Sequence, residues 1–391
     1  MKITNNSDVR VRNASVIYSC LRDHKSLTKS QLVSATGLSF VSVSKLSNRM
    51  VEKGLLLADI ATASTGGRKA STISFNSNFR YCLVVDFHHT EHFSLGIVNF
   101  ACEIIYRIDL PISLNDTLED LMDKLITAYH EISIELSSKI VGVVVVVSAV
   151  CAIDATILLQ SSNPLFEGVN ISHVFENLFP NLPIIIDNDA NIASLSQIDR
   201  GEQDYLFILM TQGIGMGIVI NGTIYRGFNG YAGELGHFKI QGINKKCKCG
   251  QSGCLRLVST LESIANDLGE SELLRGIDGV RYAKRLAERY KSGEEKVKQR
   301  VNLAADKLGE TMSQLFDIFN PDCIYAGGNI WPLFPFFRSI VVQKCREYAK
   351  LAAYHDLRVC FIDQSSTVLI LTGGGQTFFQ YWLSHYFEKV L

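Results

Sequence analysis

The chain has 391 residues, of which 47% are hydrophobic and 20% charged, values that are ordinary for a soluble globular protein. This length allows two or three domains and enough core to fold without disulfide or metal staples. The amino terminus lacks the apolar run of a secretory signal, and the longest apolar run, residues 140–153, is too short to span a bilayer. We therefore expect a cytoplasmic protein without membrane insertion.

The formal net charge of −1 conceals an uneven distribution of charge along the chain. Residues 1–75 hold eleven Lys and Arg against four Asp and Glu, a net charge of +7, whereas the remainder carries −8. A basic amino-terminal segment on an acidic body predicts a separate module that binds a polyanion.

The first 76 residues show the pattern of a helix-turn-helix. Apolar residues at helical spacing predict a first helix within residues 14–27. Thr28 and Gln31 fit a capping box at the start of a second helix, and Gly37 fits the left-handed turn that ends it. Ser39 is a suitable cap for a third helix.

The third predicted helix, residues 40–54, has two different faces. Val43, Leu46 and Met50 form its inward stripe, and short polar and basic side chains lie on the opposite side. Such side chains suit the base edges and phosphates of a DNA major groove. We expect DNA contacts from Ser42, Ser44, Lys45, Asn48 and Arg49.

Two strand-like segments follow and enclose a loop that contains Gly66-Gly67-Arg68-Lys69. This pattern predicts a wing whose Arg68 and Lys69 enter a narrow, electronegative minor groove. Together the elements predict a winged helix-turn-helix domain over residues 1–76 that binds double-stranded DNA. The alternative is a small helical domain with an incidental basic face.

From Tyr81 onward, predicted strands and helices alternate, and several strands end in Asp, Gly or Thr. This organisation predicts a two-lobed α/β fold of the actin-like ATPase type, with ligands in the crevice at the strand ends. We expect this body to occupy residues 80–391, with lobes at residues 80–188 and 189–391.

Three of the ten cysteines fall within eight positions of one loop, residues 233–257. Clustered cysteines in a cytoplasmic protein bind metal more often than they form disulfides. Three thiolates and one imidazole make a complete tetrahedral set for Zn²⁺, with no open position for water, which favours a structural ion. The predicted ligands are His237, Cys247, Cys249 and Cys254; the alternative is a set of free thiols.

Three blocks of sequence resemble the ROK family (repressor, open reading frame, kinase). They read GYAGELGHFKIQGINKKCKCGQSGC, IDNDANIASL and TQGIGMGIVINGTIYRG. With the basic head in front, the chain resembles the sugar-responsive repressors of this family, such as those of xylose, N-acetylglucosamine or glucose metabolism. The resemblance covers nearly the whole chain and implies a ROK sugar-kinase-like body with zinc at the four positions above.

The resemblance also implies a sugar site. In ROK kinases an Asn-Asp pair meets the sugar and the Asp acts as general base, and here the pair is Asn188 and Asp189. Glu234 and His237 match two further sugar contacts and Asn163 another, and the metal would fix the orientation of the His237 ring. The alternative for Asp189 is a helix-start carboxylate satisfied by backbone amides.

Two parts of the sequence depart from the family pattern. Arg256 stands where the family has a sugar-binding Glu, so a donor replaces an acceptor. Either the ligand bears an acid or phosphate, or Arg256 pairs with Glu234 and partly closes the pocket. The phosphate-binding turn that reads DxGGT in the kinases reads Asp86-Phe87-His88-His89-Thr90 here, and its two imidazoles should obstruct ATP.

These features predict a transcriptional regulator, acting as a repressor, rather than an enzyme. We expect a sugar or sugar-phosphate effector and a homodimer or tetramer whose paired heads read DNA half-sites. The alternatives are an ATP-dependent sugar kinase with an appended helical module, and a repressor controlled by a partner protein. The aromatic carboxy-terminal segment, residues 378–391, either packs on the body or forms a dimer or partner surface.

Overall fold

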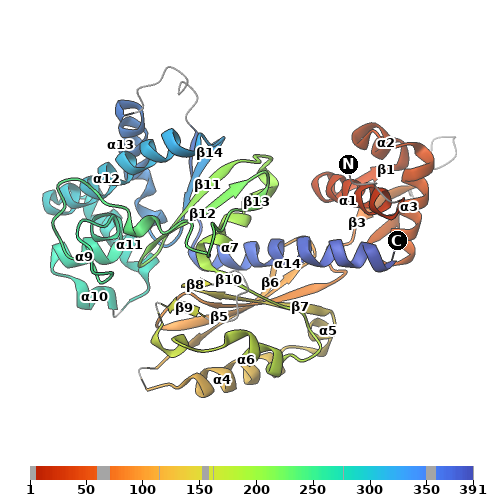
Figure 1. Ribbon diagram of the computed structural model, residues 1–391, viewed down its shortest axis with the longest axis horizontal. Helices are drawn as coiled ribbons and strands as arrows, with labels where there is room; N and C mark the ends of the chain where they lie inside the picture. The colour runs from red at the N-terminus through yellow and green to blue at the C-terminus, as the bar shows by residue number, and fades with distance from the viewer. Residues whose placement is uncertain are drawn as a thin grey trace.

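The molecule consists of a small head and two α/β lobes, joined by the long helix α14 (Ser366–Val390), which is blue in Figure 1. In the part of the chain that the structure describes, no helix is long and apolar enough to cross a membrane. The computed structural model describes residues 6–59, 71–113, 115–151, 158–161, 163–275, 277–348 and 358–390.

The head has the winged helix-turn-helix arrangement that the sequence predicts. Its three strands pair in the order β1–β3–β2, and both pairings are antiparallel. Strand β1 was not predicted, and the predicted wing residues Arg68 and Lys69 lie outside the described residues. The elements are α1 (Asn6–His24), β1 (Ser26–Thr28), α2 (Lys29–Thr36), α3 (Phe40–Glu52), β2 (Leu56–Asp59) and β3 (Thr72–Phe75).

Local capping signals set the helix-turn-helix as expected. The Gln31 N–H donates to Thr28 Oγ1 and the Thr28 N–H donates to Gln31 Oε1, which completes the capping box. Gly37 ends α2 with a φ of 68°, and the Ser39 hydroxyl accepts the Ser42 N–H at the start of α3. The turn between the two helices is therefore specified by its own residues.

Each lobe is built on a five-stranded sheet with the same plan. The first sheet has the order β10–β7–β4–β5–β6, with β4, β5 and β6 antiparallel and β7 and β10 added in parallel. The second, β13–β12–β11–β14–β15, repeats this pattern of an antiparallel meander followed by two parallel strands. This duplication confirms the predicted two-lobed actin-like fold.

The first sheet and its surroundings contain the following elements. The strands are β4 (Tyr81–Phe87), β5 (His92–Asn99), β6 (Ile104–Pro111), β7 (Ile140–Val147), β8 (Ala149–Cys151), β9 (Leu158–Ser161) and β10 (Ile184–Asn188). The helices are α4 (Leu118–Glu131), α5 (Ile134–Ser137), the 3-10 helix η1 (Pro164–Phe166) and α6 (Ile171–Leu178).

The second sheet is surrounded by more helices than the first. Its strands are β11 (Tyr205–Met210), β12 (Ile214–Ile220), β13 (Thr223–Ile224), β14 (Cys323–Gly327) and β15 (Val359–Phe361). The helices are α7 (Asp189–Leu195), η2 (Ile198–Arg200), η3 (Leu235–His237), α8 (Arg256–Ser259), α9 (Leu261–Leu268), α10 (Ser271–Arg275), α11 (Gly279–Lys291), α12 (Glu295–Phe319), η4 (Trp331–Leu333) and α13 (Phe334–Tyr348).

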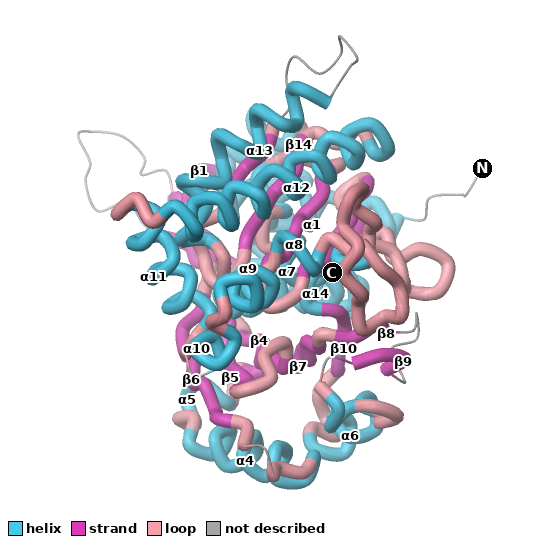
Figure 2. Tube along the Cα trace, turned by 90° about the vertical axis from the view of Figure 1, so that its left-hand side faces the viewer, coloured by secondary structure: helices cyan, strands magenta, loops and turns pink. Residues whose placement is uncertain are grey.

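Helices α7 and α14 lie between the two sheets, and the remaining helices of the two lobes lie on the outer sides (Figure 2). Along each buried strand, alternate residues face opposite cores. On β7, for example, Val144 packs in the central core that contains α14, whereas Val143 and Val145 pack in the outer core beneath α4 and α6. Both faces are apolar, which explains the continuous Val run of β7.

Helix α14 also carries the head. The rings of Tyr18 and Phe75 from the head pack on Phe100 of the first lobe, with centroids 5.1 and 5.2 Å away. Phe379 and Trp382 of α14 contact the same Phe100 ring at 5.1 and 6.0 Å. The aromatic carboxy-terminal segment thus packs on the body and the head, as the simpler of its two interpretations predicted.

Candidate metal centre and effector site

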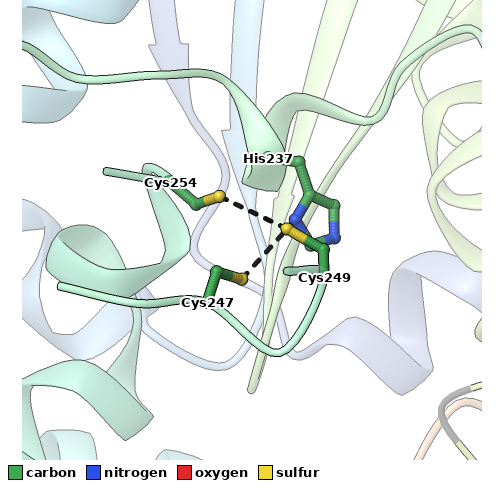
Figure 3. A group of neighbouring side chains, drawn as sticks. All are labelled: His237, Cys247, Cys249 and Cys254. Carbon is green, nitrogen blue, oxygen red and sulfur yellow. Dashed lines mark hydrogen bonds between the residues drawn. The ribbon is translucent and has the colours of Figure 1, made fainter. Parts of the chain in front are cut away.

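The loop after β13 gathers the four predicted metal ligands into one cluster. Their donor atoms all lie within 4.8 Å of one another, with Cys247 Sγ 3.7 Å from His237 Nδ1 and Cys249 Sγ 3.6 Å from Cys254 Sγ (Figure 3). In a zinc tetrahedron with Zn–S bonds of about 2.3 Å, sulfur atoms lie about 3.8 Å apart. The residues therefore fit a four-coordinate zinc ion.

The loop backbone holds these ligands in place by short-range pairing. The Cys247 N–H donates to the Gln251 carbonyl at 2.7 Å, and the backbone of Lys239 pairs with that of Cys254 in an isolated antiparallel β-bridge. Gly253 has a φ of 83°, and a Cβ there would lie 2.7 Å from the Ile243 carbonyl oxygen, so only glycine fits this turn.

A cation would relieve an electrostatic cost in this cluster. Burial, reinforced by hydrogen bonding to Cys249, raises the pKa of the Cys254 thiol to about 12. A bound Zn²⁺ stabilises thiolates and lowers such a pKa. Because His237 turns Nδ1 toward the sulfurs, Nε2 stays on the side of the ring away from them and is available to another partner.

Asp189 lies at the junction of β10 and α7, in the space between the lobes. Its side chain is buried, and this burial raises the pKa of the carboxyl to about 7 against the hydrogen bonds that Ser148 and the Ala190 N–H donate to it. The charges of Asp86 and Glu234 raise it further. A carboxyl with this pKa exchanges a proton near neutral pH and suits a hydroxyl ligand.

The two candidate asparagines mainly serve the backbone. Asn188 Oδ1 accepts the Ala190 N–H at 2.8 Å as the cap of α7, and its Nδ2 donates to the Ala149 carbonyl at 3.0 Å. Asn163 is buried, and its Oδ1 accepts the Leu165 N–H at 3.1 Å. Each amide group keeps at least one N–H for a ligand.

The contacts of Arg256 exclude one of the two explanations that the sequence left open, its pairing with Glu234. Of the carboxylates that the structure describes, only Glu262 pairs with Arg256, at 3.6 Å, so the Glu234–Arg256 pair does not form. Glu234 is accessible to solvent, although desolvation by the surrounding protein raises the pKa of its carboxyl and the neighbouring His237 and Arg256 oppose that rise. Glu234, His237 and Arg256 thus share one region with Asp189.

The turn that replaces the phosphate-binding loop is filled by histidine. His88 Nδ1 lies 2.7 and 2.8 Å from the two oxygens of Asp86, and its Nε2 lies 2.6 Å from Ser366 Oγ at the start of α14. Burial lowers the pKa of His88 to about 3, so the ring is neutral and its Nδ1–H donates to Asp86. Asn329 extends this buried network through Ser366.

The second glycine-rich turn serves packing. A Cβ on Gly215 would lie 2.8 Å from the Ala190 side chain, and one on Gly217 would lie 2.5 Å from that of Ser194. Glycine at these positions therefore lets β12 approach α7 closely. The sequence attributed this run of glycines to a tight hairpin, whereas Gly215 and Gly217 lie within β12 and serve its packing on α7.

Helix α3 places its predicted faces as expected. Val43, Leu46 and Met50 are buried, and Lys45 and Arg49 are exposed. Ser44 and Asn48 both accept from Lys29 Nζ of α2, at 3.3 and 2.7 Å, and Ser42 is half-buried. That these residues contact DNA stays a prediction.

Two exposed apolar residues on this helix were missed. Phe40 and Val41 begin α3 with exposed fractions of 56% and 75%. The amino-terminal residues of a recognition helix meet base edges, where apolar side chains contact the thymine methyl group. Their signal in the sequence was their position directly after the Ser39 cap.

Together, a winged helix-turn-helix, a duplicated actin-like body and a closed His–Cys₃ loop define a sugar-kinase-type protein with a head of the DNA-binding type. The model of the ROK family matches residues 85–364, and the chain belongs to this family. The resemblance seen in the sequence motifs is thereby confirmed.

Relatives of two kinds resemble the chain. The xylose repressor of Caldicellulosiruptor bescii is 23% identical over 89% of this chain and 90% of its own length. The glucokinase of Halalkalibacterium halodurans is 27% identical, over 72% of this chain and 90% of its own. The crystal structure of a ROK family transcriptional regulator, a homolog of the Escherichia coli MLC protein, has a TM-score of 0.77 at 18% identity and covers 97% of this chain and 99% of that one.

Proposed function

We propose that the chain is a sequence-specific DNA-binding transcriptional regulator of sugar metabolism, acting as a repressor. The observation that carries this proposal is the head: α3 presents Lys45 and Arg49 on an exposed face, and the head packs on the carboxy-terminal end of α14 (Figure 1). Likeness to a xylose repressor covers 89% of the chain, more than residues 80–391 alone can supply, whereas likeness to a glucokinase covers 72%. The functional units are residues 1–76 and 80–391, with lobes at 80–188 and 189–391.

The loop 233–257 is proposed to hold one structural Zn²⁺. Its ligands would be His237 Nδ1 and the thiolates of Cys247, Cys249 and Cys254, a closed set that leaves no position for an activated water. When bound, the ion supplies folding energy to the loop and fixes the His237 ring.

The effector is proposed to be a sugar or a sugar derivative that binds between the lobes. Asp189 and Glu234 accept its hydroxyl hydrogens, His237 offers Nε2, and Asn163 and Asn188 offer amide N–H groups. Arg256 is half-exposed, and among the described carboxylates it contacts Glu262 alone, at 3.6 Å, so it is available to an acidic or phosphorylated ligand. A ligand regulates only if it binds the two states of the protein with different affinity.

Phosphoryl transfer is not part of this proposal. Imidazoles fill the turn where the family kinases have glycines, and the buried contacts of His88 with Asp86 and Ser366 hold its ring there. Asp189 then serves as a hydrogen-bond partner for a ligand. A coupled ADP-release assay over a sugar panel tests this: turnover that Asp189→Asn abolishes would establish a kinase.

DNA binding is tested with the full chain and operator sequences selected from a random library. Lys45→Ala with Arg49→Ala should weaken binding at least about tenfold and flatten its salt dependence, because each phosphate contact releases counterions. Lys284→Ala with Arg285→Ala, on α11 of the second lobe, is the matched control and should bind as the wild type does. Equal binding by both double variants would exclude α3 as the docking helix.

Effector binding is tested by thermal shift over sugars, amino sugars and their phosphates. We expect a phosphorylated or acidic compound to stabilise the wild type, and Arg256→Glu to shift the preference to neutral sugars. If no compound stabilises either protein, the effector proposal fails, and control by a partner protein becomes the leading explanation. A homodimer or tetramer is proposed on the symmetry of paired half-sites, and sedimentation tests it.

A further inference from the structure

A second cluster of metal-binding side chains lies outside the His–Cys₃ loop. The turn between β4 and β5 brings together His89, Glu91 and His92, and one donor atom from each lies within 4.8 Å of the others. The three residues are close in sequence, and the tight turn between two antiparallel strands turns their side chains toward one another. This cluster belongs to the first lobe and shares no residue with the zinc loop.

The imidazoles of the cluster are packed against each other. The His89 ring centroid lies 4.3 Å from that of His92 and 3.7 Å from that of His88. His88 is saturated by Asp86 and Ser366, but the His92 ring forms no hydrogen bond with any residue that the structure describes. His89 is buried, and its Nε2 lies 3.5 Å from Thr367 Oγ1, a contact at the long limit of a hydrogen bond.

The carboxylate of the cluster is positioned from the opposite lobe. Gln212, in the turn between β11 and β12, donates through Nε2 to Glu91 Oε1 at 3.2 Å. The second oxygen of Glu91 accepts no hydrogen bond within the described part of the chain. The hydrogen bond from Gln212 to one oxygen therefore orients the carboxylate, as hydrogen bonds to metal-binding carboxylates commonly do. The other oxygen is free to bind a metal ion.

From this geometry we propose that His89, Glu91 and His92 form a second metal site, for a divalent transition ion such as Zn²⁺. Two imidazoles and one carboxylate suit zinc, cobalt or nickel, and they leave a fourth position for water or a ligand oxygen. The site is more open than the His–Cys₃ loop because Glu91 is exposed. We therefore expect it to bind its ion more weakly than the His–Cys₃ loop does and to exchange it. The site lies next to the Gln212–Glu91 contact between the two lobes.

Metal stoichiometry of the full chain tests the site. After equilibration with Zn²⁺ and removal of free ion, elemental analysis should give about two zinc ions per wild-type chain and about one in His92→Gln or Glu91→Gln. His173→Gln, an exposed histidine on α6, is the matched control and should keep two. Titration calorimetry with Zn²⁺ should show the weaker site lose at least about tenfold in affinity in both cluster variants.

Substitution with Co²⁺ separates the two sites by their donors. Thiolate-to-cobalt charge transfer reports only the His–Cys₃ site, whereas both sites contribute visible d–d absorption. His92→Gln should therefore lower the d–d absorption by the share of the second site without changing the charge-transfer band. One zinc per wild-type chain at saturation, or two in both cluster variants, would refute the second site. If His92→Gln fails to fold, the exposed Glu91→Gln decides the question alone.

Discussion

At the scale of single residues, Asp189 links proton binding to folding. Its carboxyl has a pKa of about 7 in the fold, against about 4 when unfolded, so the folded protein binds this proton more tightly. Its contribution to stability is present below about pH 4 and is lost as the pH rises to about 7.

Asp189→Asn should therefore stabilise the protein at high pH. We expect an unfolding free energy about 1–4 kcal/mol above that of the wild type at about pH 8, and little difference at about pH 4, since one pKa unit is worth about 1.4 kcal/mol. Urea denaturation across this range measures it. Asp123→Asn, on the exposed side of α4, is the control, and an identical pH profile for Asp189→Asn would contradict the assignment.

A substitution of Val41 tests whether the exposed apolar residues at the start of α3 contact DNA. Val41→Ser should leave the unfolding free energy within about 0.5 kcal/mol of the wild type, because the side chain is 75% exposed. Affinity for an operator with thymine at the contacted position should fall roughly tenfold, as the apolar contact with its methyl group is lost. Val9→Ser, on α1, is the control: an equal loss there would show a general effect on the head.

At the scale of elements, α7 and η2 connect the effector region to the head. Asp189 begins α7, and the short η2 that follows carries Asp199. Arg22 of α1 donates to Asp199 through Nη2 and to Gln376 of α14 through Nη1, and Gln376 also donates to Asp199. A ligand that displaced α7 would therefore also move α1, because Arg22 of α1 is bound to the Asp199 carboxylate.

Asp199→Asn should weaken this connection. The loss of charge should lower the unfolding free energy by about 1 kcal/mol, a value discounted because Asp199 is 38% exposed. The fold-change in operator affinity that the effector produces should decrease, while binding of the effector itself stays unchanged. Fluorescence anisotropy with labelled operator, with and without effector, measures both; an unchanged response would show that α14 alone carries the coupling.

At the scale of the whole molecule, the head lies at one end of α14 and the second lobe at the other (Figure 1). The zinc loop belongs to the second lobe, where it carries His237 and stands next to Glu234. The head core, in contrast, is formed by α1, α2, α3 and its own strands, packed on α14. A substitution that disrupts the loop 233–257 should therefore impair the proposed effector site and leave the fold of the head intact.

Removal of the metal from the loop tests this separation. Cys254→Ser should lower the melting temperature and abolish effector binding, because a buried ligand is lost and the His237 ring is no longer fixed. Operator affinity without effector should stay within about threefold of the wild type, a difference below about 1 kcal/mol. Elemental analysis reports the loss of zinc, and anisotropy with labelled operator reports DNA affinity. A zinc-depleted variant that binds operator much more weakly than the wild type would contradict the separation.

Sequence patterns predicted features that depend on residues close together in the chain. The capping box at Thr28, the turn at Gly37 and the four ligands of the zinc loop all follow from local hydrogen bonding and spacing. The start of α1 at Asn6 and the strand β1 were not predicted, because a short polar segment and a three-residue strand carry no clear periodicity.

By itself, the sequence determined the helix-turn-helix head, the two-lobed body, the His–Cys₃ cluster and the loss of the phosphate-binding glycines, since each depends on residue types at fixed short spacings. The tertiary structure alone decided that Arg256 contacts Glu262 instead of Glu234, that α14 runs between the lobes to the head, and that Gln212 reaches across to Glu91. The physical reason is that periodicity tells which face of an element is apolar, whereas the partner of that face depends on how distant segments pack.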